Sequence, residues 1–327
     1  MRLLLTGGFG NIGSHVLAEL RRRGHRVRVL SLDTPEDRRR ARGVGGVDVM
    51  WGDIRDPATV ASAVDGAEAV LHLAAVIPPG SEDDPEYARQ VNVDGTRTVI
   101  RACTAQARPP KLLFASTFDV HGHTLHRDPP RRVDDPTVPT DAYTAHKIAG
   151  EEMVRASGLD WFIPRFADVP IIGIRPAEPI MFEIGLDNRI EVLHPADAAV
   201  ALANALDTPQ VWGRVLFLGG GPTCQLTYRE YLTRMLGAMS LDMLPDNAFS
   251  GKPYATDWLD TAESQRLLAY QSRAVDDIVA DIAATLGWRR YLTPLARPLA
   301  RRAMLRLSPY ASAAGVTGGA GATQRQT

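Results

Sequence analysis

A glycine-rich turn follows the first apolar run of the chain and reads Thr6-Gly7-Gly8-Phe9-Gly10-Asn11-Ile12-Gly13. It lies between a predicted strand, Arg2 to Leu5, and a predicted helix from about Ile12 to Arg23. In such a turn Gly7 can bend the chain sharply, Gly10 lacks the Cβ that would block a pyrophosphate, and Gly13 lets helix and strand pack closely. The free N–H groups at the helix N-terminus favour phosphate. Its place after the first strand therefore predicts a dinucleotide-binding βαβ unit rather than an ordinary glycine loop.

Short apolar runs alternate with helical patterns through the first half of the chain. Such alternation predicts an α/β fold, a doubly wound parallel sheet (Rossmann) with helices on both faces. Ligands of these sheets bind at the carboxyl ends of the strands. The other predicted strands are Val27–Leu32, Asp48–Trp51, Ala69–Leu73, Lys111–Ala115 and Arg214–Leu218. The other predicted helices are Pro57–Val64, Tyr87–Ala107, Pro195–Leu206, Thr227–Met239 and Ala274–Leu286.

The pattern loosens beyond about Arg165, and the segment Val169 to Pro179 carries three prolines and is predicted to be a loop. We expect an NAD(P)-binding Rossmann domain formed by residues 1–168 with a returning segment, 193–220. A smaller, discontinuous C-terminal substrate lobe would comprise residues 169–192 and 221–310. Residues 311–327 lack an apolar pattern and are predicted to form a disordered tail.

The 327 residues include 37 basic and 38 acidic side chains, which gives a formal net charge of −1 and a pI of about 6.7. This balance argues against nucleic acid as the main partner, because polyphosphate binding normally shows as a strongly basic chain. No apolar run approaches the ~18 residues of a membrane span, and no signal-peptide apolar region is present. Cys103 and Cys224 lie far apart and form no metal-type cluster. We therefore expect a cytoplasmic protein without a bound metal.

The charge is unevenly distributed, because the last acidic residue is Asp281. After it, the segment Trp288–Tyr310 mixes leucines with six arginines. A basic segment of this kind can lie on an anionic membrane surface, which would give a peripheral membrane contact. Pro294 and Pro298 are expected to interrupt any long helix here, and packing against the substrate lobe is the simpler interpretation.

A tyrosine and a lysine stand four residues apart in Tyr143-Thr144-Ala145-His146-Lys147. On a helix these positions share one face, so both side chains would point into one pocket. The lysine cation would lower the pKa of the tyrosine, which suits Tyr143 to act as a general acid or base near neutral pH. One loop upstream lies the run Phe114-Ala115-Ser116-Thr117-Phe118-Asp119-Val120-His121-Gly122. His121, His123 and His126 lack the accompanying carboxylate or thiol pattern of a metal site.

Together these motifs resemble the extended short-chain dehydrogenase/reductase superfamily, specifically its NAD-dependent epimerase/dehydratase branch. The resemblance covers nearly the whole chain to about Tyr310 and is thinner after Arg165. It implies an enzyme that transfers hydride between a nicotinamide and a carbon bearing a hydroxyl or carbonyl group. By resemblance, Tyr143 passes the proton, Lys147 tunes Tyr143 and binds the nicotinamide ribose, and Thr117 orients the reacting oxygen. The family usually has tyrosine where His121 stands.

The resemblance also implies cofactor contacts. The residue that ends the second strand selects the cofactor in this family, and here it is Ser31, with an acid only at Asp33. Ser31 would not repel a 2′-phosphate and the arginines at 38–40 could reach one, whereas Asp33 favours NAD, so NAD or NADP stays open. Asp53 would accept from the adenine amine while Ile54 packs on the ring. The implied cofactor set is Gly7, Gly10, Asn11, Ile12, Gly13, Ser31, Asp53, Ile54, Leu73, Ala74, Ala75, Asn92, Ser116, Tyr143, Lys147 and Phe166.

The spacing of two late motifs bears on the substrate. Nucleotide-sugar members of the family carry a long stretch between an arginine motif and a His-x-x-Asp motif, which match Pro164-Arg165-Phe166 and His194-Pro195-Ala196-Asp197 here. Arg165 and His194 are only 29 positions apart, which favours a small or apolar substrate, sugar-derived substrates included, over a bulky nucleotide sugar. Asp197 is interpreted either as a charge at a helix N-terminus or as a site residue.

Two alternative functions stay open, and the resemblance also implies that the chain pairs with a second copy of itself. A non-catalytic NAD(P)-binding regulator could be built on the same fold, although the presence of Thr117, Tyr143 and Lys147 together disfavours it. A true nucleotide-sugar epimerase/dehydratase is the other alternative. The family often dimerises through the two helices that here contain Asn92 and Tyr143, so the resemblance implies a homodimer.

Overall fold

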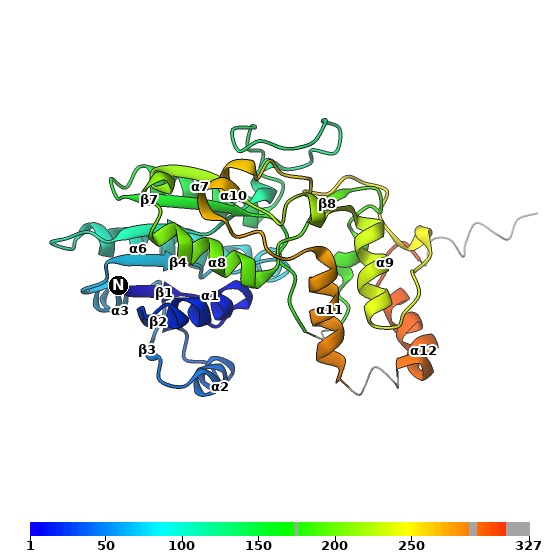
Figure 1. Ribbon diagram of the computed structural model, residues 1–327, viewed down its shortest axis with the longest axis horizontal. Coiled ribbons are helices and arrows are strands. Elements are labelled where there is room, and N and C mark those ends of the chain that lie inside the picture. Colours follow the sequence, from blue (N-terminus) through cyan, green and yellow to red (C-terminus); the bar gives the residue numbers. More distant parts are fainter. Residues whose placement is uncertain (174–175, 288–292, 312–327) are drawn as a thin grey trace, which may run out of the picture. The chain divides into compact units, whose positions relative to one another are not determined.

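The computed structural model describes residues 1–173, 176–287 and 293–311. In these residues, eight strands form one parallel sheet in the order β3-β2-β1-β4-β5-β7-β6, with β9 also paired to β7 (Figure 1). The order runs outward from β1 in both directions, which confirms the predicted doubly wound α/β fold. The strands are β1 (Arg2–Thr6), β2 (Arg26–Ser31), β3 (Asp48–Trp51), β4 (Ala69–His72), β5 (Lys111–Phe114), β6 (Ser116–Thr117), β7 (Trp161–Phe166) and β9 (Arg214–Leu218).

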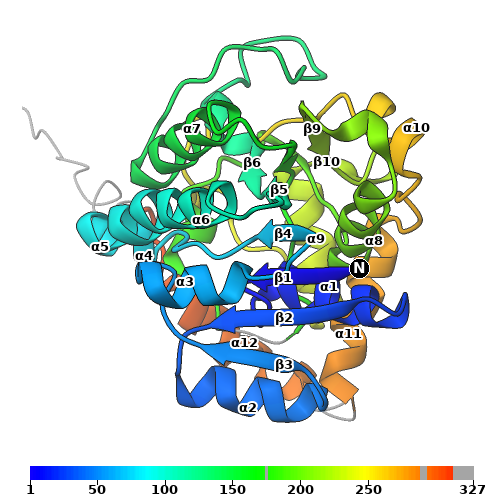
Figure 2. The ribbon, with the colours of Figure 1, turned by 90° about the vertical axis from the view of Figure 1, so that its left-hand side faces the viewer.

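Alternating side chains of β1 divide the core into two layers. Leu3 and Leu5 belong to one apolar cluster with α1 and α8, whereas Leu4 belongs to a second cluster with α3 and α6. Figure 2 shows these two pairs of helices on opposite faces of the sheet. Both faces are therefore buried, which is why β1 reads as a continuous apolar run. The helices concerned are α1 (Asn11–Arg22), α3 (Pro57–Val64), α6 (Thr96–Thr104) and α8 (Pro195–Leu206).

The glycine turn brings α1 against the end of β1. Gly7 has φ +70°, and a Cβ there would lie 2.8 Å from the backbone nitrogen of Ala74. A Cβ on Gly13 would lie only 2.0 Å from the carbonyl oxygen of Gly7. Both positions therefore require glycine, one for its backbone conformation and both for the close approach of neighbouring backbone.

Three helical segments differ from the sequence-based expectation. The predicted helix Tyr87–Ala107 is divided into α5, a π-helical turn η1, and α6. A helix α2 was not predicted, because its arginine-rich sequence buries no residue and so shows no apolar periodicity. Pro294 and Pro298 were expected to interrupt the basic segment, yet both lie in α12. The bounds are α5 (Pro85–Arg89), η1 (Gln90–Gly95), α2 (Pro35–Val44) and α12 (Thr293–Leu305).

The described chain divides into two compact units. The first comprises Met1–Ile171, Glu191–Gln225 and Ala255–Val275, and the second comprises Ile172–Ile190, Leu226–Tyr254 and Asp276 onward. Residues 255–275 belong to the first unit, because Leu259, Leu268 and Tyr270 join its core cluster. The remaining elements include α7 (Ala142–Arg155), η2 (Phe118–His121), η3 (Pro179–Phe182), β8 (Arg189–Glu191), β10 (Gln225–Thr227), α9 (Tyr228–Ala238), α10 (Ala262–Leu268) and α11 (Val275–Leu286).

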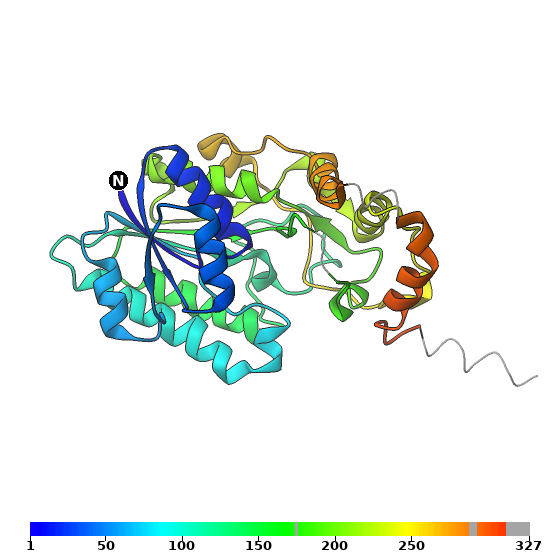
Figure 3. The same ribbon diagram turned by 90° about the horizontal axis from the view of Figure 1, so that it is seen from below.

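Short contacts hold the second unit together. The Tyr228 hydroxyl donates to the Met181 carbonyl at 2.9 Å, and the rings of Phe182 and Phe249 lie 5.2 Å apart. Figure 3 shows α9 between α11 and α12. Part of the basic segment, residues 288–292, and most of the predicted tail, residues 312–327, lie outside the described residues. None of the described helices is long and apolar enough to cross a bilayer.

We expect Gly13→Ala to lower the free energy of unfolding by about 3 kcal/mol and to abolish dinucleotide binding, because the new Cβ overlaps the Gly7 carbonyl. Urea denaturation and calorimetric titration with NAD would measure both effects. Gly43→Ala is the matched control, since Gly43 lies in α2 with no atom within 4 Å of a new Cβ, and it should gain about 0.5–1 kcal/mol. Equal stability of the two variants would contradict this account of the turn.

Candidate active site

A cavity of about 280 Å³ opens at the carboxyl ends of β1, β2 and β4. No side chain caps the N-terminus of α1, so the N–H groups of its first turn are not satisfied by a capping side chain. The glycine turn and the N-terminus of α1 fit the pyrophosphate of a dinucleotide. Of the residues implied by the sequence, the cavity is lined by Gly7, Gly10, Ser31, Asp53, Ile54, Leu73, Ala74 and Ala75.

The other residues of the turn have packing roles. The Asn11 side-chain amide donates to the Val169 carbonyl at 2.8 Å, so it holds the chain just after β7. Ile12 packs against the core cluster on its side of the sheet. Any contact of Asn11 or Ile12 with the cofactor would therefore come through the backbone.

A carboxylate does stand near the end of β2, but it comes from α2. The Ser31 hydroxyl donates to Asp37 Oδ2 at 2.8 Å, and both residues line the cavity. Asp33 is instead paired with Arg38, whose guanidinium lies 5.0 Å from the centre of the Trp51 ring, and neither Asp33 nor Arg38 lines the cavity. Asp37 is not recognisable from the sequence, because α2 buries no residue and shows no apolar periodicity.

Arg40 lines the same part of the cavity, where its Nη1 donates to the Phe9 carbonyl at 2.6 Å. Its second nitrogen donates to Glu36 at 2.8 Å. The only one of the three arginines at 38–40 that lines the cavity is therefore already bonded to a backbone carbonyl and a carboxylate.

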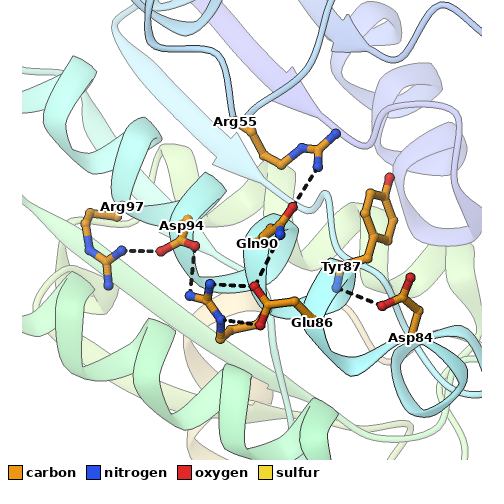
Figure 4. Close-up of polar contacts among 8 residues, drawn as sticks. Arg55, Asp84, Glu86, Tyr87, Gln90, Asp94 and Arg97 are labelled. Carbon is orange, nitrogen blue, oxygen red and sulfur yellow. Dashed lines mark hydrogen bonds and ion pairs between the residues drawn. The ribbon is translucent and has the colours of Figure 1, made fainter.

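At the adenine end, Asp53 is held by Arg55. The Asp53 carboxylate accepts from Arg55 Nη2 at 2.6 Å and from Nε at 2.9 Å. Burial opposes ionisation of Asp53, but the hydrogen bonds and charge of Arg55 outweigh it and keep the pKa of this carboxyl below its usual range. Arg55 also donates to Gln90 at 3.1 Å and lies 5.0 Å from the centre of the Tyr87 ring (Figure 4). Tyr87 lines the cavity, although no motif of the sequence points to it.

A buried chain of hydrogen bonds joins β1, the strand before the glycine turn, to η1. His72 lies between two threonine hydroxyls, with Nδ1 at 2.7 Å from Thr6 and Nε2 at 3.0 Å from Thr96. The Thr96 hydroxyl donates to the carbonyl of Asn92, so Nε2 is the protonated nitrogen of His72. Burial, helped by the charge of Lys147, lowers the pKa of His72 to about 3 and keeps the ring neutral.

Asn92 holds the backbone beside the cavity. Its side-chain oxygen accepts from the Val76 N–H at 2.7 Å, and its nitrogen donates to the Val76 carbonyl at 2.8 Å. These two bonds tie Asn92 to the backbone of Val76, which lines the cavity. It fixes the chain that follows Leu73, Ala74 and Ala75 along the cavity.

Tyr143 and Lys147 share one face of α7, as their spacing predicts. The Lys147 ammonium donates to the Ala115 carbonyl at 2.7 Å and lies 5.7 Å from the centre of the Tyr143 ring. Burial lowers the pKa of Lys147 to about 8. The pKa of Tyr143 is raised, by burial and by the charges of Asp119 and Asp141, so the predicted lowering by Lys147 is not seen in the protein alone.

Thr117 is buried at the end of β6, where its hydroxyl oxygen accepts from the Asp119 N–H at 3.2 Å. Asp119 is a third titratable group at this place, because its charge acts on Tyr143 and its carboxyl is hydrogen-bonded by Thr117. Burial, with the charges of Asp168 and Asp141, raises the pKa of Asp119 to about 7. The sequence motif around Asp119 does not reveal this role, because the role depends on the buried surroundings of the carboxyl group.

The neighbouring Ser116 faces a buried ion pair instead of the cavity. Its hydroxyl donates to Glu151 at 2.7 Å, and Arg165 donates to the two carboxylate oxygens of Glu151 at 2.8 and 2.7 Å. Phe166, paired with Thr117 in the sheet, is buried in the core. Neither Ser116 nor Phe166 lines the cavity, although both belong to the cofactor set that the resemblance implies.

His121 completes this buried group. Its Nε2 lies 2.9 Å from Arg165 Nη1, and because arginine can only donate, Nε2 must accept. Nδ1 then carries the proton and donates to the Pro136 carbonyl at 3.2 Å. Burial and the charge of Arg165 lower the pKa of His121 to about 4, so the ring is neutral near pH 7.

Asp197 anchors a returning segment of the first unit. Its buried carboxylate accepts from the Ser272 hydroxyl at 2.7 Å and from the Arg273 N–H at 2.9 Å. His194 caps α8 by accepting from the Ala196 N–H at 3.0 Å. In this motif, His194 therefore caps the start of α8, and Asp197 holds the segment around Ser272 and Arg273 against it.

The fold and the site together define a Rossmann-type domain with a cavity that fits a dinucleotide and a Tyr-x-x-x-Lys pair on α7. Residues 3–169 match the profile of the NAD dependent epimerase/dehydratase family. The chain belongs to this family, which confirms the resemblance found in its motifs.

Individual relatives differ in how much of the chain they match. D-erythronate dehydrogenase of Cupriavidus necator is 32% identical over 55% of this chain and 57% of its own length. dTDP-glucose 4,6-dehydratase of Mycolicibacterium smegmatis is 28% identical over 91% of this chain and 96% of its own. The crystal structure of dTDP-glucose 4,6-dehydratase from Streptomyces venezuelae, with NAD bound, has a TM-score of 0.76 at 24% identity and covers 89% of this chain and 98% of that one. The last similarity supports the fold.

We expect His72 to make the protein less stable as the pH falls. The unfolded chain binds a proton at His72 below about pH 6.5, whereas the folded protein resists it down to about pH 3. The stabilisation is therefore present above pH 6.5 and is lost as the pH drops, by up to about 1.4 kcal/mol per pH unit.

The variant His72→Gln isolates this effect. Urea denaturation at several pH values should show a shallower loss of stability between pH 6.5 and 4 than in the unmodified protein, although the variant starts from a lower value at pH 7. Parallel curves for the two proteins would show that His72 is not the titrating group.

Proposed function

We propose that the protein oxidises a secondary alcohol, or reduces the corresponding carbonyl, reversibly, with Tyr143 as the proton-transferring group. Bound NAD would supply the site that accepts or returns the hydride. The observation that carries the proposal is that Lys147 lies 5.7 Å from the centre of the Tyr143 ring, that Asp119 links Tyr143 to Thr117, and that all these residues belong to the same compact unit as the dinucleotide cavity. This cavity lies at the carboxyl ends of the strands, where ligands of doubly wound sheets bind.

Each residue has a chemical task in this proposal. The Thr117 hydroxyl holds the reacting oxygen of the substrate. Tyr143 is protonated in the protein alone, since its pKa is raised, and it can donate its proton to a carbonyl oxygen. Lys147, fixed by the Ala115 carbonyl, lies beneath the tyrosine ring and stabilises the phenolate that remains.

Asp119 supports chemistry beyond simple oxidation. A carbonyl formed in the substrate makes the adjacent C–H acidic, and a carboxylate with a pKa of about 7 can take that proton near neutral pH. Return of the proton to the opposite side gives an epimer. Departure of a hydroxyl from the next carbon as water gives a dehydrated product, and return of the hydride then regenerates NAD. Asp119 therefore favours an epimerase or dehydratase outcome over oxidation alone.

The substrate we propose is a small, sugar-derived polyol or acid. The names of the relatives point to sugar-derived compounds, since they include D-erythronate dehydrogenase and dTDP-glucose 4,6-dehydratase. The segment of only 29 positions between Arg165 and His194 favours the smaller kind. A nucleotide sugar is the alternative, which turnover of dTDP-glucose or UDP-glucose would support.

We propose NAD rather than NADP as the preferred cofactor. Asp37 places a negative charge where Ser31 ends β2, and a carboxylate there accepts from a ribose 2′-OH but repels a 2′-phosphate. Arg40, the cation in the same part of the cavity, is already bonded to Phe9 and Glu36.

The variant Asp37→Asn should lower the preference for NAD over NADP by about tenfold, because it removes this repulsion while an amide can still accept from Ser31. The ratio of kcat/KM for the two cofactors measures the change. Asp33→Asn is the matched control, since Asp33 pairs with Arg38 outside the cavity and its loss should leave the ratio unchanged. An unchanged ratio in Asp37→Asn would exclude this role.

The proposed reaction is tested with two variants on a panel of sugar acids and nucleotide sugars. Tyr143→Phe should lower kcat by about 10²–10⁴-fold with little change in NAD affinity, since it removes only the transferred proton. In deuterated water, Asp119→Asn should lower deuterium uptake at the carbon next to the reacting one by at least about 100-fold, while hydride transfer continues.

Two results would overturn these assignments. Full activity of Tyr143→Phe would remove the enzyme proposal and favour a non-catalytic NAD-binding regulator. Normal deuterium uptake by Asp119→Asn would remove Asp119 from the chemistry and leave Tyr143 as the acid–base group.

A further inference from the structure

Helix α12 and the turn after it divide cleanly into two sides. The partly buried side comprises Ala300, Arg301, Met304 and Leu305, followed by the buried Ser308. These positions recur at intervals of three and four residues, as one face of a helix does. We call the opposite, exposed side the outer face of α12, and it comprises Leu299, Arg302, Ala303, Arg306 and Leu307.

The inner side is bonded to the rest of the second unit. Arg301 Nη1 donates to the Met243 carbonyl at 2.7 Å, and the Ser308 hydroxyl donates to the Ala248 carbonyl at 2.5 Å. Just beyond, the Tyr310 hydroxyl donates to Glu183 at 2.6 Å. These contacts come from separate segments of the second unit, so they fix which side of α12 faces outward.

The outer face of α12 combines apolar and basic side chains. Leu299 is 75% exposed and Leu307 is 37% exposed. Arg302 and Arg306 lie on the same face, and the sequence has no acidic residue after Asp281.

Two other arginines of the second unit are paired with carboxylates. Arg229 pairs with Asp246 at 2.7 Å, and Arg234 pairs with Asp276 at 2.5 Å. In the described part of the chain, no carboxylate forms an ion pair with any arginine of the outer face of α12. Its positive charge is therefore available to an external anion.

We propose that the outer face of α12 binds the surface of an anionic phospholipid membrane. The arginines would contact lipid phosphates, and Leu299 would enter the boundary between headgroups and acyl chains, with α12 parallel to the surface. Leucine distinguishes this partner from nucleic acid, because a nucleic acid backbone offers charge to the arginines but no apolar layer for Leu299. The contact is peripheral, in keeping with the absence of a membrane-spanning helix among the described residues.

The experiment is co-sedimentation of the full chain with vesicles of phosphatidylglycerol and, separately, of phosphatidylcholine. The protein should sediment with the anionic vesicles alone and be released at high salt, which screens the arginines. Leu299→Ser should lower the partition coefficient about tenfold, through the loss of apolar insertion. The double variant Arg302→Gln/Arg306→Gln should lower it about twenty-fivefold, or fivefold for each arginine.

The control is Arg39→Gln/Arg42→Gln, which removes the same charge from exposed positions of α2. This variant should bind the anionic vesicles as the unmodified protein does. Because all these positions are exposed, thermal melting should show that the variants remain folded.

Three results would overturn the proposal. The first is no sedimentation with phosphatidylglycerol, and the second is an equal loss of binding in the α2 control. The third concerns heparin. If the arginine variant weakens retention on heparin and vesicle binding alike while Leu299→Ser changes neither, the face binds polyanions in general and not lipid.

Discussion

The contact between the Gly13 Cα and the Gly7 carbonyl is the constraint on which the dinucleotide site depends. Because no Cβ intervenes, α1 begins directly at the end of β1, and its N-terminus faces the carboxyl edge of the sheet. Gly7 at φ +70° brings the same turn against Ala74, so the ends of β1 and β4 are closely apposed. The position of the phosphate-binding helix end follows from backbone contacts that tolerate no side chain.

Much of this arrangement is visible in the sequence. The strands Asp48–Trp51 and Arg214–Leu218 and the helix Pro57–Val64 match their predicted bounds, because each is a short apolar run or amphipathic stretch with clear ends. The pairing of Tyr143 with Lys147 follows from helical spacing alone. The family follows from the same motifs and the glycine turn.

The remaining features depend on tertiary structure. Asp37 reaches the cavity from a helix whose sequence has no apolar periodicity, and Ser116 turns toward Glu151 because adjacent side chains of a strand point to opposite sides. The raised pKa of Asp119 results from burial beside other carboxyl groups, which sequence distance does not reveal. The homodimer, the cytoplasmic location and the limits of the substrate lobe stay predictions.

The π-helical turn η1 changes the angular phase of the helical stretch that contains it. A single π turn adds one residue to a regular helix, and each residue of an α-helix corresponds to about 100° of rotation. Tyr87 and Thr96, nine residues apart, would point about 180° apart on an unbroken α-helix, but the extra residue brings them within about 80° of each other. Tyr87 can thus line the dinucleotide cavity while Thr96 forms its hydrogen bond with His72. Deleting one residue from Gln90–Gly95 would leave Tyr87 and Thr96 eight residues, again about 80°, apart on a regular helix, so the chain would keep both contacts while losing the π turn.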